Sequence, residues 1–177
     1  MIFGGTGFLG NEIKNLLSKR DYETQTVSVS NKKSDYRFDI SDFKSFDKLP
    51  VNFFNIIINC ASKGPDKDYL DSNNLNESFN VNIKGQQNIC NWLKHQKTIK
   101  KIINCSTLSV ISKPWKINLT EDFESYNHGD HVIYSSSKLF QELLLKTFCD
   151  KQSIDLIQIR FSALYGKGMK KNGIIWK

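Results

Sequence analysis

Apolar runs of strand length alternate along the chain with stretches of helical periodicity. The runs cover residues 1–3, 26–29, 53–58, 101–104 and 154–159, with a short further candidate at 36–38. Three intervening segments repeat apolar residues every three or four positions, as one helix face requires. Their apolar positions are Phe8, Leu9, Ile13, Leu16 and Leu17, then Phe79, Ile83, Cys90 and Leu93, then Leu139, Phe140, Leu143, Leu144 and Phe148. Strand and helix alternating in this way predict right-handed crossovers and an α/β fold with a parallel sheet covered by helices on both faces.

The longest runs and the irregular segments refine this picture. The run 53–58 is almost continuously apolar, which favours a strand buried on both faces. Residues 112–129 lack periodicity and are expected to form a loop, and a loop of that length in a compact domain is more often functional than idle. The first run is shorter than the usual strand of about five residues, and residues 173–177 stop without a cap. We therefore expect a fragment of a longer protein.

Length and composition are those of one ordinary globular domain over residues 1–177, with 39% hydrophobic and 24% charged residues. Ten glycines and three prolines without a short period exclude fibrous and low-complexity classes. We find neither a signal peptide nor an apolar run of about 18 residues. The expectation is a cytoplasmic protein with no membrane partner.

Charge and cysteine usage argue against two other classes. The net charge is +7, but four of the lysines lie in the last eleven residues and the rest carries only +3. A diffuse lysine surplus of this kind does not predict a nucleic-acid partner. The four cysteines, at positions 60, 90, 105 and 149, form no CxxC pair and have no histidine at ligand spacing. We therefore expect no metal site, and read the cysteines as small buried side chains in a reducing compartment.

A glycine-rich turn follows the first run and opens the first helix. Gly4, Gly7 and Gly10 are three residues apart, in the pattern GxxGxxG. In such a turn one glycine makes the bend, one lets the backbone approach a pyrophosphate, and one lets helix and strand pack closely. The helix N-terminus then presents free N–H groups and a positive dipole end to the phosphates. A merely flexible turn is the alternative interpretation.

The end of the second strand bears on the choice of cofactor. An acid about 20 residues past the last glycine would hold the ribose of NAD. Here the chain reads Ser30-Asn31-Lys32-Lys33, without an acid. Small polar residues and two lysines favour the 2′-phosphate of NADP over NAD, unless the lysines form a solvated turn. Asp39-Ile40, after the third strand, could place a carboxylate near the adenine amine.

A tyrosine and a lysine four residues apart form the candidate catalytic pair. On a helix, Tyr134 and Lys138 face the same way. A nearby ammonium lowers the pKa of a phenol from about 10 toward neutrality. The tyrosine can then exchange a proton with a substrate hydroxyl or carbonyl. The pattern YxxxK is common by chance, so its weight comes from the motifs around it.

Taken together, these motifs resemble the extended short-chain dehydrogenases/reductases, the NAD(P)-dependent epimerase/dehydratase group. The resemblance covers essentially the whole chain. Beyond the glycine turn, the Asp39-Ile40 pair and the Tyr134–Lys138 pair, it rests on Ile58-Asn59-Cys60-Ala61-Ser62, Asn82-Ile83-Lys84-Gly85, Ser106-Thr107-Leu108-Ser109-Val110, Thr120-Glu121-Asp122 and Arg160-Phe161-Ser162-Ala163-Leu164-Tyr165-Gly166. The resemblance implies a Rossmann-like doubly wound sheet in the strand order 3-2-1-4-5-6, with the cofactor crossing between strands 1 and 4.

The resemblance also implies roles for individual residues. Tyr134 would be the acid/base, Lys138 would lower its pKa and hold the nicotinamide ribose, and Thr107 would bond the substrate oxygen. The residues expected to bind NADP or NAD are Gly4, Gly7, Phe8, Leu9, Gly10, Ser30, Asn31, Lys32, Asp39, Ile40, Cys60, Ala61, Ser62, Asn82, Tyr134, Lys138 and Phe161. Those expected to touch substrate are Ser109 and Ala163. A nucleotide-linked sugar would be the substrate and a homodimer the full-length assembly.

Some positions depart from the family pattern. Phe161 replaces a usual proline beside the nicotinamide, Ala163 stands where many nucleotide-sugar enzymes carry asparagine, and Lys167 replaces another proline. The family's substrate domain follows the sixth strand and would be largely absent here. Thr107 as a capping hydroxyl and Asn82 as a helix-packing residue remain open alternatives. So do a dinucleotide-sensing regulatory module on the same fold and an inactive fragment.

Overall fold

The computed structural model describes residues 1–29, 33–65, 72–111, 117–123, 131–166 and 168–169. These residues form a six-stranded sheet in the order β3-β2-β1-β4-β5-β6. Every adjacent pair of strands is parallel. The strands are β1 Ile2–Phe3, β2 Thr26–Ser28, β3 Tyr36–Arg37, β4 Ile56–Asn59, β5 Lys101–Thr107 and β6 Asp155–Phe161. The predicted order 3-2-1-4-5-6 is confirmed.

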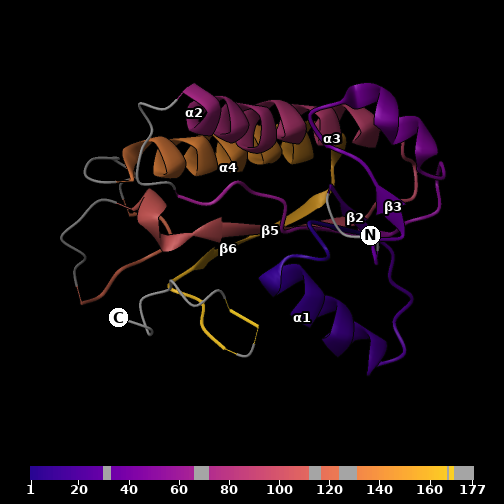
Figure 1. Ribbon diagram of the computed structural model, residues 1–177, viewed down its shortest axis with the longest axis horizontal. Helices are drawn as coiled ribbons and strands as arrows, with labels where there is room; N and C mark the ends of the chain where they lie inside the picture. Colours follow the sequence, from indigo (N-terminus) through magenta and orange to yellow (C-terminus); the bar gives the residue numbers. More distant parts are fainter. Residues whose placement is uncertain (30–32, 66–71, 112–116, 124–130, 167, 170–177) are drawn as a thin grey trace.

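Helices lie on both faces of this sheet, as the alternating pattern predicted. Helix α1, Phe8–Ser18, lies on one face, while α2, Ser72–Phe79, α3, Gly85–Leu93, and α4, Val132–Gln152, form a layer on the other (Figure 1). Two short 3-10 helices are η1, Phe43–Lys48, and η3, Leu108–Val110. The described helices include none that is both long enough and apolar enough to cross a membrane.

The core fills the space between the sheet and the layer of three helices. Its aromatic centre is Phe46 of η1, whose ring centroid lies 6.0 Å from that of Phe3 and 6.2 Å from that of Trp92. All three side chains are buried. Offset aromatic contacts of this kind add to the stabilisation that burial of the rings provides. These ring contacts connect β1 and α3 to η1, which follows β3.

The fourth strand corrects two expectations about the run 53–58. The strand begins only at Ile56 and extends to Asn59, and Phe53 and Ile56 are 51% and 42% exposed. Ile157 and Ile159 of β6 are similarly exposed. Among the described helices only α1 lies on this face, so the predicted burial of the run on both faces is wrong. An apolar run by itself cannot show whether one or two layers cover it.

The predicted helix faces are also partly wrong. Phe79 was assigned to a buried face with Leu93, but it is 51% exposed. Between α2 and α3 the chain forms a π-helical segment, η2, Asn80–Lys84. The wider turn of a π-helix changes the face on which later residues lie, so the periodicity cannot be continued across it.

Helix α4 departs from its predicted apolar face for another reason. Phe140 and Leu143 are 44% and 58% exposed. The buried side chains of this helix include Lys138, Gln141 and Glu142. Polar side chains can occupy a buried helix face when partners on neighbouring strands satisfy them. Hydrophobic periodicity does not detect such a face.

Candidate functional site

The glycine turn between β1 and α1 is closed by contacts that leave no room for side chains. Gly4 has φ +73°, and a Cβ there would lie 2.8 Å from the carbonyl carbon and oxygen of Cys60. A Cβ on Gly10 would lie 2.3 Å from the Gly4 carbonyl oxygen. Gly7 caps α1 with extended backbone, and its N–H donates to the same Gly4 oxygen at 3.0 Å. The turn is therefore built by packing and is more than a flexible connection.

Gly5 belongs to the same turn, although the spacing argument did not identify it. A Cβ at Gly5 would lie 2.3 Å from Cγ2 of Thr26 on β2. The neighbouring strand, rather than the glycine spacing, makes glycine necessary at this position. Only its place beside Gly4 in the sequence could have suggested it.

The N-terminus of α1 is suited to an anion. The first turn of this helix holds no acidic residue. The first N–H groups of a helix lack intrahelical acceptors, and the helix dipole favours negative charge there. A Cβ built on Gly166 or Gly168 would lie 3.8 Å and 3.9 Å from the Phe8 ring, so the segment after β6 comes close to the start of α1. The expected phosphate residues Phe8 and Leu9 lie in this first turn.

The residues expected to choose between NAD and NADP fall largely outside the described residues. Ser30, Asn31 and Lys32 lie there, so their predicted role stays a prediction. The next acid in the chain, Asp35, accepts bonds from the backbone N–H and the hydroxyl of Thr26, at 2.8 and 2.7 Å. Thr26 begins β2. Asp35 is thus bound to the first residue of β2, the same residue whose methyl group packs against Gly5.

Asp39 and Ile40 follow β3 and differ in environment. Asp39 is half-buried, and its Oδ1 accepts the N–H of Ser41 at 2.8 Å. Ile40 is buried, and a Cβ on Gly85 would lie 2.5 Å from its Cγ1. The glycine of the Asn-x-x-Gly motif therefore allows α3 to pack against Ile40.

Asn82, the first residue of that motif, lies in the π-helical segment and is buried. Its Oδ1 accepts the Lys63 N–H at 2.8 Å, and its Nδ2 donates to the Lys63 carbonyl at 3.0 Å and to Ser137 Oγ at 3.0 Å. Ser62 Oγ also bonds Asn82 Oδ1, at 3.2 Å. One side chain thus connects the chain after β4 to α4. The sequence suggested cofactor binding or helix packing, and these bonds join Asn82 to protein groups.

The end of β5 presents two hydroxyls close together. Thr107 Oγ1 and Ser109 Oγ lie 2.9 Å apart, and Thr107 Oγ1 accepts the Ser109 N–H at 3.2 Å. Thr107 therefore caps η3, as the alternative interpretation proposed. Capping uses lone pairs of the oxygen and leaves its proton able to bond elsewhere. Ser106, its neighbour, is buried on the strand.

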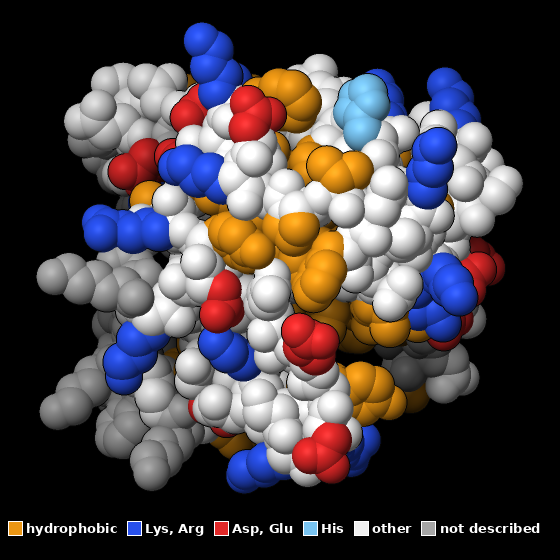
Figure 2. Space-filling model, turned by 90° about the vertical axis from the view of Figure 1, so that its right-hand side faces the viewer, with side chains coloured by type: hydrophobic (Ala, Val, Ile, Leu, Met, Phe, Trp, Pro, Cys, Tyr) orange, Lys and Arg blue, Asp and Glu red, His pale blue; other side chains and the backbone are white. Residues whose placement is uncertain are grey.

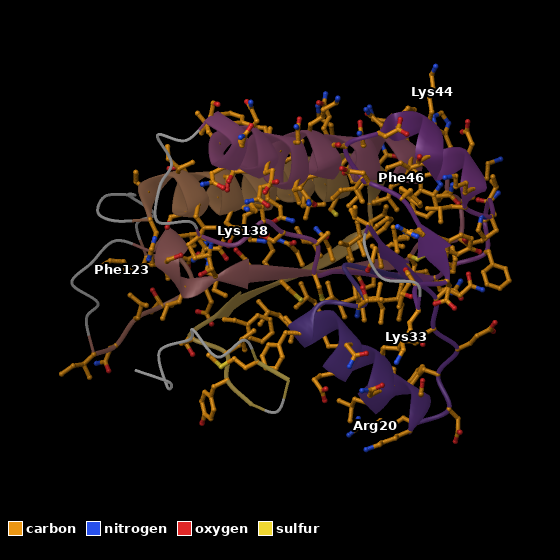
Figure 3. The ribbon with its side chains drawn as sticks, viewed as in Figure 1. Arg20, Lys33, Lys44, Phe46, Phe123 and Lys138 are labelled. Carbon is orange, nitrogen blue, oxygen red and sulfur yellow. The ribbon has the colours of Figure 1, made fainter. Side chains whose placement is uncertain are left out.

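Tyr134 and Lys138 are one turn apart on α4, as the i, i+4 spacing predicted. Lys138 is 1% exposed, and Figure 3 shows it in the layer between α4 and the sheet. Its Nζ donates to the Cys105 carbonyl at 2.9 Å and to Gln141 Oε1. Burial lowers the pKa of Lys138 to about 8, partly opposed by Cys105, Glu142 and Cys60. The bond to Cys105 places this part of α4 next to β5, two residues before Thr107.

An ion pair between α4 and β6 supports this arrangement and was not predicted. The Arg160 guanidinium donates to both carboxylate oxygens of Glu142, with Nε bonds of 3.1 and 3.2 Å and an Nη2 bond of 2.8 Å. Its Nη1 donates to the carbonyl of Glu121 at 3.0 Å. Two-point guanidinium–carboxylate pairs fix geometry as well as charge. Arg160 begins the motif Arg160–Gly166, but nothing in the sequence indicated that it pairs with Glu142.

The remaining predicted site residues follow β4 or belong to β6 and the segment after it. Ala61 and Phe161 are half-buried, Ala163 and Ser62 are exposed, and Phe161 pairs with Thr107 across β5 and β6. Within the described part of the chain, no three histidine, cysteine or acidic side chains gather as a metal site would require. Two buried polar atoms here, Ser106 Oγ and Gln141 Nε2, have no described partner.

An open cavity of about 670 Å³ lies elsewhere, at the amino ends of the strands. Its lining includes Met1, Leu16, Phe53 and Ile56. Figure 2, which views the right-hand side of Figure 1, shows hydrophobic side chains gathered near the middle of that face. The glycine turn, Thr107 and Lys138 do not line this cavity. It is therefore not the candidate functional site.

The sequence is similar to those of several known proteins. The model of the family described as "NAD dependent epimerase/dehydratase family" matches residues 1–175. UDP-glucose 4-epimerase of Vibrio cholerae is 27% identical over 183 residues, covering 97% of this chain and 53% of that protein. The human decarboxylating sterol-4-alpha-carboxylate 3-dehydrogenase is 30% identical over 146 residues, covering 80% of this chain and 37% of that protein. The chain thus spans about half, or less, of the curated relatives it matches.

A solved structure shows the same fold. RMD from Pseudomonas aeruginosa, complexed with NADPH, superposes with a TM-score of 0.79 at 18% identity. The match covers 98% of this chain and 57% of that one. At this level of identity the likeness concerns the fold, including the parallel sheet and its helices.

Proposed function

Because the chain belongs to the NAD dependent epimerase/dehydratase family, we propose that it binds a nicotinamide dinucleotide at the carboxyl edge of the sheet, where the strand order reverses between β1 and β4. The complete protein would be an epimerase, dehydratase or reductase acting on a nucleotide-linked sugar. The glycine turn carries this proposal. Its Gly4–Gly10 contact and the acid-free start of α1 leave a backbone cradle that fits a diphosphate.

The cofactor is proposed to contact the residues around that cradle. Gly4, Gly7, Phe8, Leu9 and Gly10 would surround the diphosphate. Asp39 and Ile40 would lie at the adenine, and Cys60, Ala61 and Ser62 would line the edge of β4. Asn82, whose amide bonds the protein, would act by positioning Ser62 and Ser137.

NADP is proposed to bind at least as tightly as NAD. No acid follows β2 in the sequence until Asp35, and Thr26 engages that carboxylate in two hydrogen bonds. The sequence directly after β2 instead reads Ser30-Asn31-Lys32-Lys33, and small polar residues with two lysines suit a 2′-phosphate.

Tyr134, Lys138 and Thr107 are proposed to carry the proton chemistry. A bound nicotinamide would supply hydride transfer, and the protein would orient it. Tyr134 would exchange a proton with the substrate oxygen, and Thr107 Oγ1 would hydrogen-bond that oxygen. Lys138, with its pKa at about 8, is mostly protonated near neutral pH. Its charge, one turn away on α4, would lower the pKa of the Tyr134 phenol.

The substrate and assembly are further proposals. The match to a UDP-glucose 4-epimerase supports a nucleotide-linked sugar, and Ser109 and Ala163 would face it. The match to a sterol dehydrogenase makes a sterol the competing substrate class. The complete protein is proposed to form a homodimer.

One observation favours a second function, a dinucleotide-sensing module without catalysis. Lys138 donates to the Cys105 carbonyl and to Gln141. Two of the three N–H donors of its ammonium are thereby directed to the protein. A catalytic lysine would instead use these donors to hold the nicotinamide ribose. Such a module would bind the dinucleotide and transform no substrate.

Titration of the purified chain with NADPH and NADH, followed by cofactor fluorescence and calorimetry, tests the binding proposal. We expect NADPH to bind at least as tightly as NADH. The double substitution Lys32→Ala and Lys33→Ala should weaken NADPH and leave NADH unchanged, while Lys44→Ala, an exposed lysine of η1 (Figure 3), serves as the matched control. A clear preference for NADH would contradict the NADP assignment. Absence of binding by either would overturn the cofactor proposal.

A further inference from the structure

Two cysteines face each other at the carboxyl ends of the central strands. The Sγ atoms of Cys60 and Cys105 lie 3.4 Å apart. Cys60 directly follows β4, and Cys105 lies in β5. Asn59 and Asn104, the residues before them, are paired in the parallel register. The two cysteines therefore continue the ladder as neighbours 45 positions apart in the sequence.

Both side chains point away from the layer of three helices. Asn59 Nδ2 bonds Gln86 on α3 and Asn104 Oδ1, so the asparagines face that layer. Successive side chains on a strand point to opposite faces. The cysteines consequently lie on the α1 side of the sheet. Cys60 is half-buried and Cys105 is 7% exposed.

We propose that Cys60 and Cys105 form an oxidation site that closes reversibly to a disulfide. Neighbouring strands hold Cα atoms at a separation that a disulfide can bridge, and the sulfurs need to approach from 3.4 Å to about 2.05 Å. The proposed catalytic chemistry uses neither thiol.

Hydrogen peroxide can serve as the oxidant for this disulfide. One cysteine, as the thiolate, takes an oxygen from hydrogen peroxide and becomes a sulfenic acid, and the hydroxide released accepts the proton that the thiol had lost. The second thiol then attacks the sulfenic sulfur, and water leaves as the S–S bond forms. In total, two thiols are oxidised and one peroxide is reduced to two waters.

The surroundings favour a thiolate at Cys105. The hydrogen bond from Cys60, together with the ammonium of Lys138, lowers the pKa of Cys105. The same bond raises the pKa of Cys60, because that thiol then acts as the donor. Unlike Cys105, the remaining cysteines have raised pKa values, since burial raises the pKa of Cys90 to about 12 and that of Cys149 to about 11. They provide an internal control.

Mass spectrometry of the purified chain after mild peroxide treatment tests the site. We expect a loss of about 2 Da, because two hydrogens leave, together with a Cys60–Cys105 peptide link that dithiothreitol reverses. Cys60→Ser should abolish the loss and leave at Cys105 a sulfenic acid that dimedone traps, whereas Cys105→Ser should abolish both the loss and the dimedone adduct. The double variant Cys90→Ala and Cys149→Ala should retain it.

A link between other cysteines, overoxidation without a link, or unreacted thiols would overturn the proposal. Peptide mapping of the unaltered protein gives this answer even if a variant fails to fold. Circular dichroism of each variant shows whether its result concerns a folded chain.

Oxidation should also affect the proposed cofactor site, and this consequence alone rests on the proposed function. The Cys60 carbonyl packs where a Cβ of Gly4 would lie. A disulfide that draws Cys60 toward β5 should therefore disturb the glycine turn and weaken NADPH binding severalfold. Unchanged affinity of the oxidised chain would refute the consequence. Failure of the reduced chain to bind NADPH would refute the proposed function and leave the oxidation site standing.

Discussion

Replacing Gly10 with alanine tests whether close packing of α1 on the glycine turn controls both stability and cofactor binding. The added Cβ would lie 2.3 Å from the Gly4 carbonyl oxygen, 2.8 Å from the Gly5 Cα and 3.0 Å from the Gly4 carbonyl carbon. All three atoms are backbone, so no side chain can move aside. Ordinary contact begins near 3.4 Å, and α1 must therefore shift outward by about 1 Å.

The expected cost follows from two opposing effects. Overpacking of this kind destabilises by about 1–3 kcal/mol. Alanine gains about 1 kcal/mol over glycine in helix propensity. We therefore expect the free energy of unfolding to fall by up to about 2 kcal/mol. The displaced N–H groups of α1 should also weaken dinucleotide binding by about tenfold, or about 1.4 kcal/mol.

Urea titration, with the fluorescence of buried Trp92 as one probe, measures the stability, and calorimetry with NADPH measures the affinity. Gly7→Ala is the matched control, since its Cβ would approach the Gly4 oxygen only to 3.3 Å at an ordinary φ of −70°. We expect this variant to lose less than about 1 kcal/mol. Equal stability and affinity of the Gly10 variant and the unaltered chain would refute the packing argument.

Three further predictions concern α4. In the product of the complete reading frame, Tyr134→Phe should abolish turnover and leave cofactor affinity nearly intact, because the ring still packs but the proton is gone; near-full turnover in an enzyme assay would favour the sensing module. Between pH 8 and 10.5, the free energy of unfolding of the unaltered chain should rise by up to about 3 kcal/mol relative to that of Lys138→Met. The reason is that, over this range, Lys138 is protonated in the unfolded state and largely deprotonated in the folded state. Denaturant titrations across pH measure this difference, and a flat difference would contradict the burial of a protonated lysine. Glu142→Gln should destabilise by about 2 kcal/mol, because the Arg160 guanidinium loses its buried counter-charge. Asp150→Asn, which breaks an exposed pair on the same helix, should change stability by less than about 0.5 kcal/mol, and equal losses in the two variants would show that burial does not matter here.

Local patterns in the sequence determined the fold class and much of the candidate site. Alternating strand and helix periods indicated the parallel sheet, and the resemblance gave its strand order. The spacing of Gly4, Gly7 and Gly10 located the turn before α1, and the i, i+4 spacing placed Tyr134 and Lys138 on one helix. These features depend on residues close together in the chain, where backbone geometry fixes which positions share a face.

The tertiary structure decided which distant groups meet. The need for glycine at position 5 comes from Thr26 on β2, and the π-helical turn around Asn82 moved Phe79 to the surface. Strand register brought the sulfurs of Cys60 and Cys105 together, and the packing of α4 paired Glu142 with Arg160. Hydrophobic periodicity indicates whether a position tends to be buried, but does not indicate which residue it will contact. A buried polar face such as that of α4 is stable only through those partners, so the sequence alone could not reveal it.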